Sequence, residues 1–189
     1  AGGAQLLDRQ GNDLEIHRFT PEEMYALVDF CEDYELPLRF TFHDANYAYT
    51  GYETFIRREK AKNLNNNIRD GEDQDHHLVE MPFGAFGFAP RDRAEAFRQK
   101  YGYLGLHFLY SYPGSDGCDI LKKGIDKGYG LRALARLAGL DPAACVAVGD
   151  GDNDAAMLQA AGLGVAMGNA SAAAKAAAGQ IGPDAAPCG

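Results

Sequence analysis

The chain has 189 residues, of which 46% are hydrophobic and 24% charged, a composition typical of a soluble globular protein with a core of its own. Its formal net charge of -9 argues against nucleic acid as a partner, because phosphate backbones bind surfaces rich in Lys and Arg. No run approaches the ~20 apolar residues that a membrane-spanning helix needs, and four scattered cysteines without a CxxC pair predict reduced thiols in a cytoplasmic protein.

The first 120 residues predict an α+β domain with an antiparallel sheet. Residues 20–23 (TPEE) combine a Thr cap, a Pro at the first helical position and two acids in the first turn, so they mark a helix start. The most polar stretch of the chain covers residues 65–75 and predicts an exposed loop. In chain order we expect a hairpin over 5–19, a helix over 21–34, strands over 38–42 and 45–49, a helix over 51–64, a strand over 85–88, a helix over 90–101, and strands over 104–110 and 118–121.

The composition changes after about residue 122, where aromatic residues almost disappear and Ala, Gly and Leu dominate. Short strands and helices then alternate, which is typical of a parallel α/β layer. The predicted fold class is therefore α/β, with a partial Rossmann-like core over 121–178, a preceding α+β domain over 1–120, and a loose tail over 179–189. The expected elements of the core are helices over 127–138, 153–161 and 171–178 and strands over 145–148 and 163–167.

Residues 149–154 (GDGDND) follow an apolar strand and lead into a helix, at the point where open α/β sheets place ligands. Their three carboxylates repel one another unless a cation neutralises them, and carboxylate oxygens are the ligands that Mg²⁺ prefers. A helix cap explains one acid but not the whole run. An EF-hand loop shares the alternating spacing, but it would need Gly at Ala155 and Glu at Ala161. The run therefore predicts a Mg²⁺ site.

Lys127 begins the predicted helix that lies one αβ step before the acidic run. A lysine at a helix start is usually a solvated surface residue. Beside three carboxylates, however, its ammonium group can meet a phosphate oxygen and offset their charge. We therefore predict that Lys127 and Asp150 belong to one phosphate-handling site.

Residues 124–170 resemble the carboxyl half of haloacid dehalogenase-like (HAD) phosphatases, specifically the Cof-type, subclass IIB branch. Lys127 with Gly128 matches the third motif of that family, a Lys in a K-G pair ahead of a helix. Residues 149–154 match its fourth motif, G-D-x-x-N-D, and residues 167–169 (MGN) fall where the family has a similar run. The order and the spacing of these motifs make the resemblance specific.

This resemblance implies a Mg²⁺-dependent phosphomonoesterase that acts on a small phosphorylated metabolite through an aspartyl-phosphate. It implies that Asp150 binds the metal, that Asp154 supports the metal or its waters, and that Asn153 lies near the phosphate. It assigns Lys127 to the charge on the phosphoryl group and on the attacking carboxylate. It also implies that residues 1–120 are a cap domain that selects the substrate.

One departure from the family pattern decides what this chain can do alone. The family's nucleophile lies in an N-terminal D-x-D motif after the first strand, with a Ser/Thr motif after the second, and neither is found before Lys127. Residues 73–75 (DQD) have the letters without a buried strand ahead of them, and Thr41 fits the cap better than the core. Because the chain also begins with Ala1, we expect a fragment or processed product without phosphatase turnover.

Two alternatives stay open at this point. The chain could be a non-catalytic binding or regulatory module with a degenerate core, and a homodimer could cover the exposed edge of the half-sheet. The pair His76 and His77 has no Cys or Glu at ligand spacing, so it predicts a cap loop that contacts substrate sooner than a metal site. The substrate itself is left open among sugar phosphates, nucleotides and cofactor phosphates.

Overall fold

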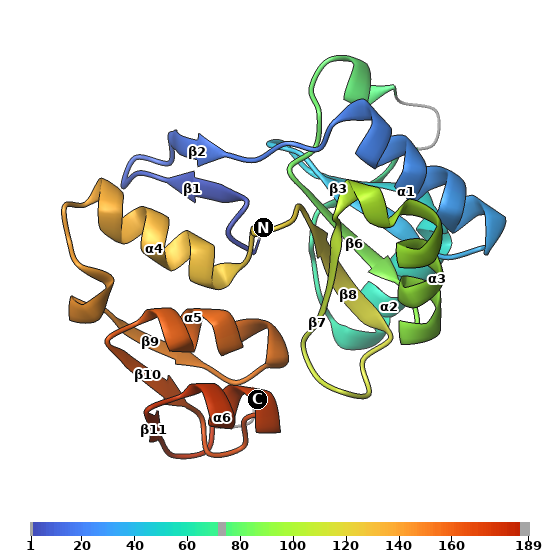
Figure 1. Ribbon diagram of the computed structural model, residues 1–189. Coiled ribbons are helices and arrows are strands. Elements are labelled where there is room, and N and C mark those ends of the chain that lie inside the picture. Colours follow the sequence, from blue (N-terminus) through green and yellow to red (C-terminus); the bar gives the residue numbers. More distant parts are fainter. Residues whose placement is uncertain (1, 72–74, 186–189) are drawn as a thin grey trace. The chain divides into compact units, whose positions relative to one another are not determined.

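The computed structural model describes residues 2–71 and 75–185 and divides the chain into two compact units (Figure 1). The first unit comprises residues 16–108 and 116–123, and the second comprises residues 2–15, 109–115 and those from 124 onward. Asp73 and Gln74 of the candidate D-x-D run lie outside the described residues, as does Cys188. Within the described ranges, every helix is too short or too polar to cross a lipid bilayer.

A six-stranded sheet in the order β5-β4-β3-β6-β8-β7 forms the frame of the first unit. Strand β3 pairs antiparallel with β4 and with β6, β6 pairs antiparallel with β8, and β5 pairs parallel with β4. The elements are α1 (Pro21–Asp33), β3 (Leu38–Thr41), β4 (Asn46–Thr50), α2 (Tyr52–Lys62), β5 (Ile68–Asp70), β6 (Gly84–Phe88), α3 (Arg91–Tyr101), β7 (His107–Tyr110) and β8 (Gly117–Leu121).

The start of α1 follows the local sequence. The Thr20 hydroxyl accepts a hydrogen bond from the Glu23 amide at 3.2 Å, and the Glu23 carboxylate accepts one from the Thr20 amide at 2.7 Å. This capping box satisfies two amide groups that the first helical turn leaves without partners. The predicted helix start at residues 20–23 is confirmed.

The side chains of strand β3 alternate between the two faces of the sheet. Leu38 and Phe40 are fully buried, while the alternate residues Arg39 and Thr41 point to the opposite face and are only half-buried. Helices α1 and α3 lie side by side in this unit (Figure 1). The Phe30 ring of α1 packs edge-to-face against the Phe97 ring of α3, with 5.2 Å between the ring centroids. Each fully buried Phe or Leu contributes about 1.5–3 kcal/mol to folding, so the aromatic-rich sequence builds this core.

Residues 65–75 differ from the exposed loop that the sequence predicts. Ile68–Asp70 form β5, which pairs with β4 through Asn46 opposite Ile68. The Asn46 side chain donates to the Asn66 carbonyl at 2.7 Å, and its backbone amide donates to the Asn67 carbonyl at 3.1 Å. A polar strand at a sheet edge buries little, so hydropathy alone did not reveal it.

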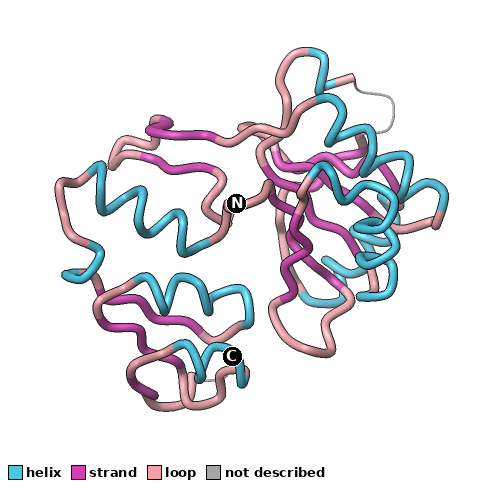
Figure 2. The backbone as a smooth tube through the Cα atoms, in the orientation of Figure 1, coloured by secondary structure: helices cyan, strands magenta, loops and turns pink. Residues whose placement is uncertain are grey.

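The second unit holds a parallel sheet in the order β11-β10-β9, with helices on one face (Figures 1 and 2). A separate two-stranded hairpin pairs β1 with β2. The elements are β1 (Gln5–Leu7), β2 (Asp13–Ile16), α4 (Lys127–Leu137), β9 (Val146–Gly149), α5 (Ala155–Ala160), β10 (Leu163–Ala166), α6 (Ala172–Ala177) and β11 (Gln180–Ile181). The predicted alternation of strand and helix after residue 122 is confirmed.

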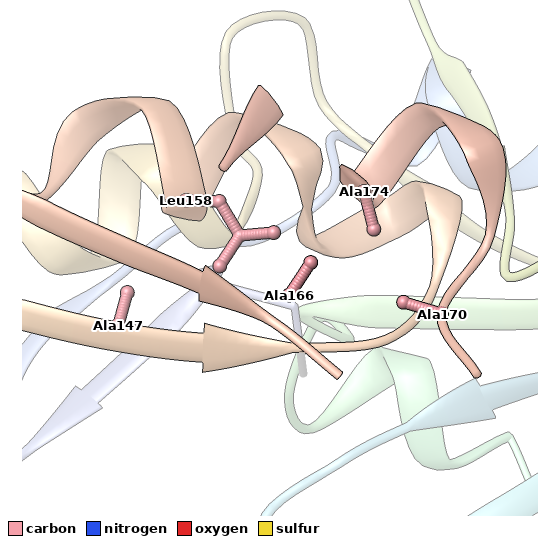
Figure 3. Close-up of a cluster of buried hydrophobic side chains, with 5 residues drawn as sticks. All are labelled: Ala147, Leu158, Ala166, Ala170 and Ala174. Atoms are coloured by element: carbon pink, nitrogen blue, oxygen red, sulfur yellow. The ribbon is translucent and has the colours of Figure 1, made fainter. Parts of the chain in front are cut away.

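Small side chains let the helices of this unit approach the sheet closely. Figure 3 shows Leu158 of α5 and Ala174 of α6 pointing toward the strand residues Ala147 and Ala166. Leu158 is the one large side chain of this five-residue cluster, which Ala170 completes. The Ala-rich composition of the segment therefore reflects close helix-on-sheet packing.

The two compact units divide the chain differently from the expected domains 1–120 and 121–178, and that domain assignment stays a prediction. The hairpin of β1 and β2 belongs with α4, because the Glu15 carboxylate accepts hydrogen bonds from the Tyr129 hydroxyl and, at 3.3 Å, from the Arg136 guanidinium. The Cα of Gly3 also lies against Gly130, where a Cβ would meet it at 3.2 Å. Such contacts between distant parts of the chain leave no local mark in the sequence.

The expected loose tail over 179–189 includes one short strand, and its residues 186–189 lie outside the described residues. Gln180 and Ile181 form β11, which pairs parallel with Val165 and Ala166 of β10. The Gly182 amide then donates to the Ala166 carbonyl at 2.8 Å. A strand of two exposed residues has no hydropathy period, so its existence depends on the edge that β10 offers.

Candidate active site

The acidic run lies at the carboxyl end of the parallel sheet, as the sequence predicts. Strand β9 ends at Gly149, and a turn of 3-10 helix over Asp152–Asp154 leads into α5. The loop after β10 is tied to it, because the Met167 amide donates to the Gly149 carbonyl at 3.0 Å and the Ser171 amide to the Asp150 carbonyl at 2.8 Å. These hydrogen bonds join the loops that follow β9 and β10 at the same end of the sheet.

Asp154 is the buried centre of this loop, with only 5% of its surface exposed. Its Oδ2 atom accepts hydrogen bonds from the Asp150 and Gly151 amides, both at 3.0 Å. Its Oδ1 atom accepts one from the Lys127 ammonium group at 2.5 Å. Both oxygens of Asp154 are thus engaged inside the protein, and the side chain connects α4 to the acidic loop.

The electrostatics of Asp154 follow from these contacts. Burial raises the pKa of the Asp154 carboxyl, but the Lys127 ammonium and the Gly151 and Asp150 amides together outweigh it, so the pKa lies below its usual value. The carboxylate is therefore charged at neutral pH, and it holds the Lys127 side chain beside the loop.

Two glycines of the motifs are required by this packing. A Cβ on Gly149 would lie 2.5 Å from the Cβ of Asp154, so only Gly lets Asp154 fold beneath the loop. A Cβ on Gly128 would lie 2.5 Å from the Ala156 carbonyl oxygen, so only Gly lets α4 and α5 approach closely enough. The K-G pair and the G-D pair are therefore parts of one packing arrangement.

Lys127 is placed by the helix that it begins. The Asp126 carboxylate caps α4 by accepting from the Tyr129 amide at 2.7 Å. The side chain of Lys127 is 37% exposed, so its ammonium group reaches both Asp154 and the surface. A cation in this position can stabilise a negative charge that develops beside the loop.

The other polar residues of the loop are arranged differently. Asp150 is exposed, and Asn153 lies close over the loop, its Oδ1 being 2.6 Å from where a Cβ on Gly151 would stand. The Asp152 amide donates to the Ser111 carbonyl at 2.7 Å. The Oδ1 atom of Asp152, in contrast, is buried without a hydrogen-bond partner in the part of the chain that the structure describes.

The donor chemistry fits a hard cation. Asp150 and Asp152 offer carboxylate oxygens, and a buried oxygen without a donor is costly unless a charge or a donor compensates it. Across residues 2–71 and 75–185, however, no group of three or more His, Cys, Asp or Glu side chains is assembled for a metal. The loop therefore offers carboxylate oxygens of the kind that Mg²⁺ prefers, without an assembled set of ligands among the described residues.

The structure brings the four predicted residues, Lys127, Asp150, Asn153 and Asp154, to one loop and the helix beside it, while their individual roles stay predictions. The sequence did not single out Asp152 or the Ser111 carbonyl. No local signal could have found the latter, since Ser111 comes from a turn far away in the chain.

The side chains of His76 and His77 contact tyrosines of the first unit. His77 lies between two tyrosine hydroxyls, with Tyr25 at 3.1 Å from Nε2 and Tyr49 at 3.0 Å from Nδ1. His76 stacks on the Tyr47 ring with a centroid distance of 4.6 Å. These contacts hold the 3-10 turn His76–Leu78 against the unit, and the predicted contact with substrate stays a prediction.

Almost the whole chain matches one protein family in sequence and solved structures of that fold. The profile of the haloacid dehalogenase-like hydrolases matches residues 2–187. The subclass IIB sugar phosphatase BT4131 superposes with a TM-score of 0.81 at 22% identity, over 96% of this chain and 68% of that one. At this identity the superposition establishes the fold and not the substrate.

Curated relatives match over shorter stretches. A phosphoglycolate phosphatase of Methanopyrus kandleri is 58% identical over 48 residues, which are 25% of this chain and 21% of that protein. The 5-amino-6-(5-phospho-D-ribitylamino)uracil phosphatase YbjI of Escherichia coli is 43% identical over 75 residues, which are 40% of this chain and 28% of that protein. The matched segments thus span less than a third of either relative.

Proposed function

This chain belongs to the haloacid dehalogenase-like hydrolases, and from that premise we propose that it forms the metal-side half of a Mg²⁺-dependent phosphomonoesterase site. The observation that carries the proposal is the arrangement around Asp154. Its two oxygens hold Lys127 and the loop amides in place, which leaves the Asp150 carboxylate exposed at the end of β9. Small phosphorylated metabolites are the proposed substrates, as the names of the matched phosphatases suggest.

We assign the roles as follows. Asp150 would hold Mg²⁺, which when bound screens the phosphate charge. Asp154 positions the loop through its amide contacts and orients the Lys127 side chain. Lys127 offers an ammonium group to the phosphoryl oxygens, and Asn153 donates its amide to them. Each role uses a group that the loop or the start of α4 already presents.

The nucleophile is the part of the reaction that these residues do not supply. Aspartyl-phosphate formation needs a second carboxylate that faces the phosphorus atom, and every carboxylate of the acidic loop sits on the metal side of the proposed site. We therefore propose that the 189 residues alone do not turn over a phosphomonoester. Measurable Mg²⁺-dependent hydrolysis of p-nitrophenyl phosphate by the purified chain, lost in Asp150→Asn, would overturn this part of the proposal.

A non-catalytic module is the second candidate. The observation that favours it is the incomplete set of metal ligands in the described ranges. A degenerate core would keep the Asp154 contacts for stability and would bind no cation at Asp150. Metal binding, measured directly, separates the two candidates.

The test is a Mg²⁺ titration of the full chain by isothermal calorimetry, with Asp150→Asn as the site variant. Asp92→Asn is the matched control, since it removes an exposed carboxylate from α3 in the first unit. We expect wild type and the control to bind Mg²⁺ alike and Asp150→Asn to lose at least about tenfold in affinity. Equal binding by all three proteins, or by none of them, would favour the degenerate module.

A further inference from the structure

A hollow with basic side chains lies in the first unit, between the end of α3, the turn that follows it, β7 and the residues after β8. Its volume is about 380 Å³, and it is here called the basic hollow. Three basic and three aromatic side chains line it, namely Arg98, His107 and Lys123 together with Phe97, Tyr101 and Phe108. All six belong to the first unit, and the proposed phosphatase site uses none of them.

The charge of the basic hollow is opposite to that of the chain. The chain has a formal net charge of -9, yet no Asp or Glu is among the described residues that line the hollow. The two cationic side chains, Arg98 and Lys123, share this space with His107. Because two cations repel each other around a common space, an anion placed between them would be attracted by both.

Basic residues near the end of a helix often have a simpler explanation, since they complement the negative end of the helix dipole. Arg98 and Lys100 in the last turn of α3 fit that explanation. It does not extend to His107, which begins β7, or to Lys123, which follows β8. Three separate elements therefore bring their basic side chains to one hollow.

The donors of these side chains are available to a ligand. Across residues 2–71 and 75–185, the side chains of His107 and Lys123 form no hydrogen bond and no ion pair. Arg98 donates from Nη1 to the Glu95 carboxylate, which occupies one of the five N–H donors of a guanidinium group. Each of the three residues can therefore donate to a bound group without giving up an existing partner.

The turn after α3 restricts the Lys123 side chain. Gly105 has a φ of 68°, in the left-handed region that favours glycine. A Cβ at this position would lie 3.3 Å from both the Cβ and the Cδ of Lys123, so the lysine stem packs directly against the glycine. This contact limits the rotamers of Lys123 and so lowers the entropy cost of ordering it on a ligand.

The aromatic side chains give the hollow a rigid apolar wall. The Phe97 ring is fully buried, and its centroid lies 5.1 Å from that of Tyr101 and 5.2 Å from that of Phe108. Charges beside such a wall interact more strongly than charges in open water, because the local dielectric constant is lower.

The number and direction of the donors select the anion. A carboxylate offers two oxygens in one plane. A phosphate group offers three strong acceptor oxygens and a charge of about −1.5 to −2 at neutral pH. An arginine, a lysine and a histidine that come from three elements can each donate to a different phosphate oxygen.

We propose that the basic hollow binds a phosphate group, either as the free ion or as part of a small metabolite. Its volume of about 380 Å³ admits both. The site lies within the first unit and uses no residue of the acidic loop. It therefore depends neither on Mg²⁺ nor on the proposed phosphatase function.

The test is an NMR titration of the full chain with inorganic phosphate in HEPES buffer without Mg²⁺, read from the backbone amides of Gly105 and His107. We expect both signals to shift and saturate. Lys123→Met keeps a long stem and removes the ammonium group, so it should weaken binding at least about tenfold, the usual effect of removing a charged hydrogen-bond partner. Lys60→Met, at an exposed lysine in the last turn of α2, should bind like wild type.

A pair of glycine variants tests the contact between the turn and Lys123. Gly105→Ala should weaken phosphate binding, because its Cβ would press on the lysine stem. Gly139→Ala is the matched control, since Gly139 has the same φ of 68° and an added Cβ there meets nothing within 4 Å. Both variants carry the same backbone strain, so only Gly105→Ala reports on Lys123. Well-dispersed amide spectra would show that each variant is folded.

Two further titrations identify the site and the source of the phosphate. Lys127→Met removes the cation of the proposed phosphatase site and should leave the saturation at Gly105 and His107 unchanged, so a failure of either proposal is distinguishable from a failure of the other. sn-Glycerol 3-phosphate that binds at least as tightly as inorganic phosphate would assign the hollow to a phosphorylated metabolite. Weaker binding would assign it to the free ion.

Three results would overturn the proposal. The first is the absence of saturable shifts with either phosphate compound. The second is an equal loss of affinity in Lys123→Met and Lys60→Met, because the attraction would then belong to the whole surface. The third is binding of malonate as tight as that of phosphate, because the hollow would then recognise charge without the geometry of a phosphate group.

Discussion

Replacement of Asp154 by Asn tests the arrangement on which the proposed site rests. The Asn side chain has one oxygen and one NH₂ group, so it cannot accept from the two loop amides and from Lys127 together. With its oxygen toward the amides of Asp150 and Gly151, the NH₂ group faces the Lys127 ammonium, donor against donor. The variant therefore loses a charge-assisted hydrogen bond that is 2.5 Å long in the wild type.

The magnitude follows from burial. A hydrogen bond to a charged partner contributes about 1.5–3 kcal/mol, whereas an unpaired buried charge costs about 3–5 kcal/mol. Asp154 is 5% exposed but the Lys127 side chain is 37% exposed, so water solvates the abandoned ammonium and the smaller range applies. We expect Asp154→Asn to lower the free energy of unfolding by about 2 kcal/mol.

Urea denaturation followed by circular dichroism measures this loss, and amide hydrogen exchange at Asp150 and Gly151 localises it. Lys127→Met and the double variant complete a cycle, for which we expect a coupling energy of about 1–2 kcal/mol. Asp92→Asn, an exposed control, should stay within about 0.5 kcal/mol of wild type. The free energy of unfolding of Asp154→Asn could instead equal that of the control, with the Asp150 and Gly151 amides still protected from hydrogen exchange. In that case Asp154 does not hold the loop, and the proposed site loses its main support.

The same carboxylate sets the direction of the pH dependence. Because the folded pKa of Asp154 lies below the ordinary value of 3.8, its contribution is present above that value and is lost as the pH falls through the folded pKa. The stability difference between wild type and Asp154→Asn should therefore shrink in acid. A difference that stays constant from neutral pH to well below the folded pKa would contradict this assignment.

Three further predictions use separate parts of the chain. Asp126→Ala should lower stability by about 1 kcal/mol by removing the cap of α4, measured by urea denaturation. Gly162→Ala should be severely destabilising, because its Cβ would lie 1.8 Å from a backbone carbonyl oxygen, whereas Gly114→Ala should unfold at the same urea concentration as wild type. Burial raises the pKa of Cys31 to about 12, so at about pH 8.5 iodoacetamide should spare Cys31 and modify the half-exposed Cys145, as peptide mass mapping would show.

Much of the local structure could be predicted because its causes are local. Thr20 and Glu23 cap α1 through their own side chains, and the strand–GDGDND–helix run places its carboxylates at a sheet end in any parallel layer. The motif residues Lys127 and Asp150 were likewise recognisable from type and spacing. Edge strands such as β5 and β11 were not, because two or three polar or exposed residues bury too little to leave a pattern.

What the sequence by itself determined, then, is the family and the residue types of the acidic loop. The tertiary structure decided which carboxylate is buried and which is exposed. Asp150 and Asp154 look equivalent in the sequence, yet one is exposed and the other is buried beneath Lys127 and the loop amides. It also decided that Arg39 and Asp119, 80 positions apart, share one face of the sheet. The physical reason is that burial and cross-strand pairing depend on contacts between distant segments, which neighbours in the sequence do not specify.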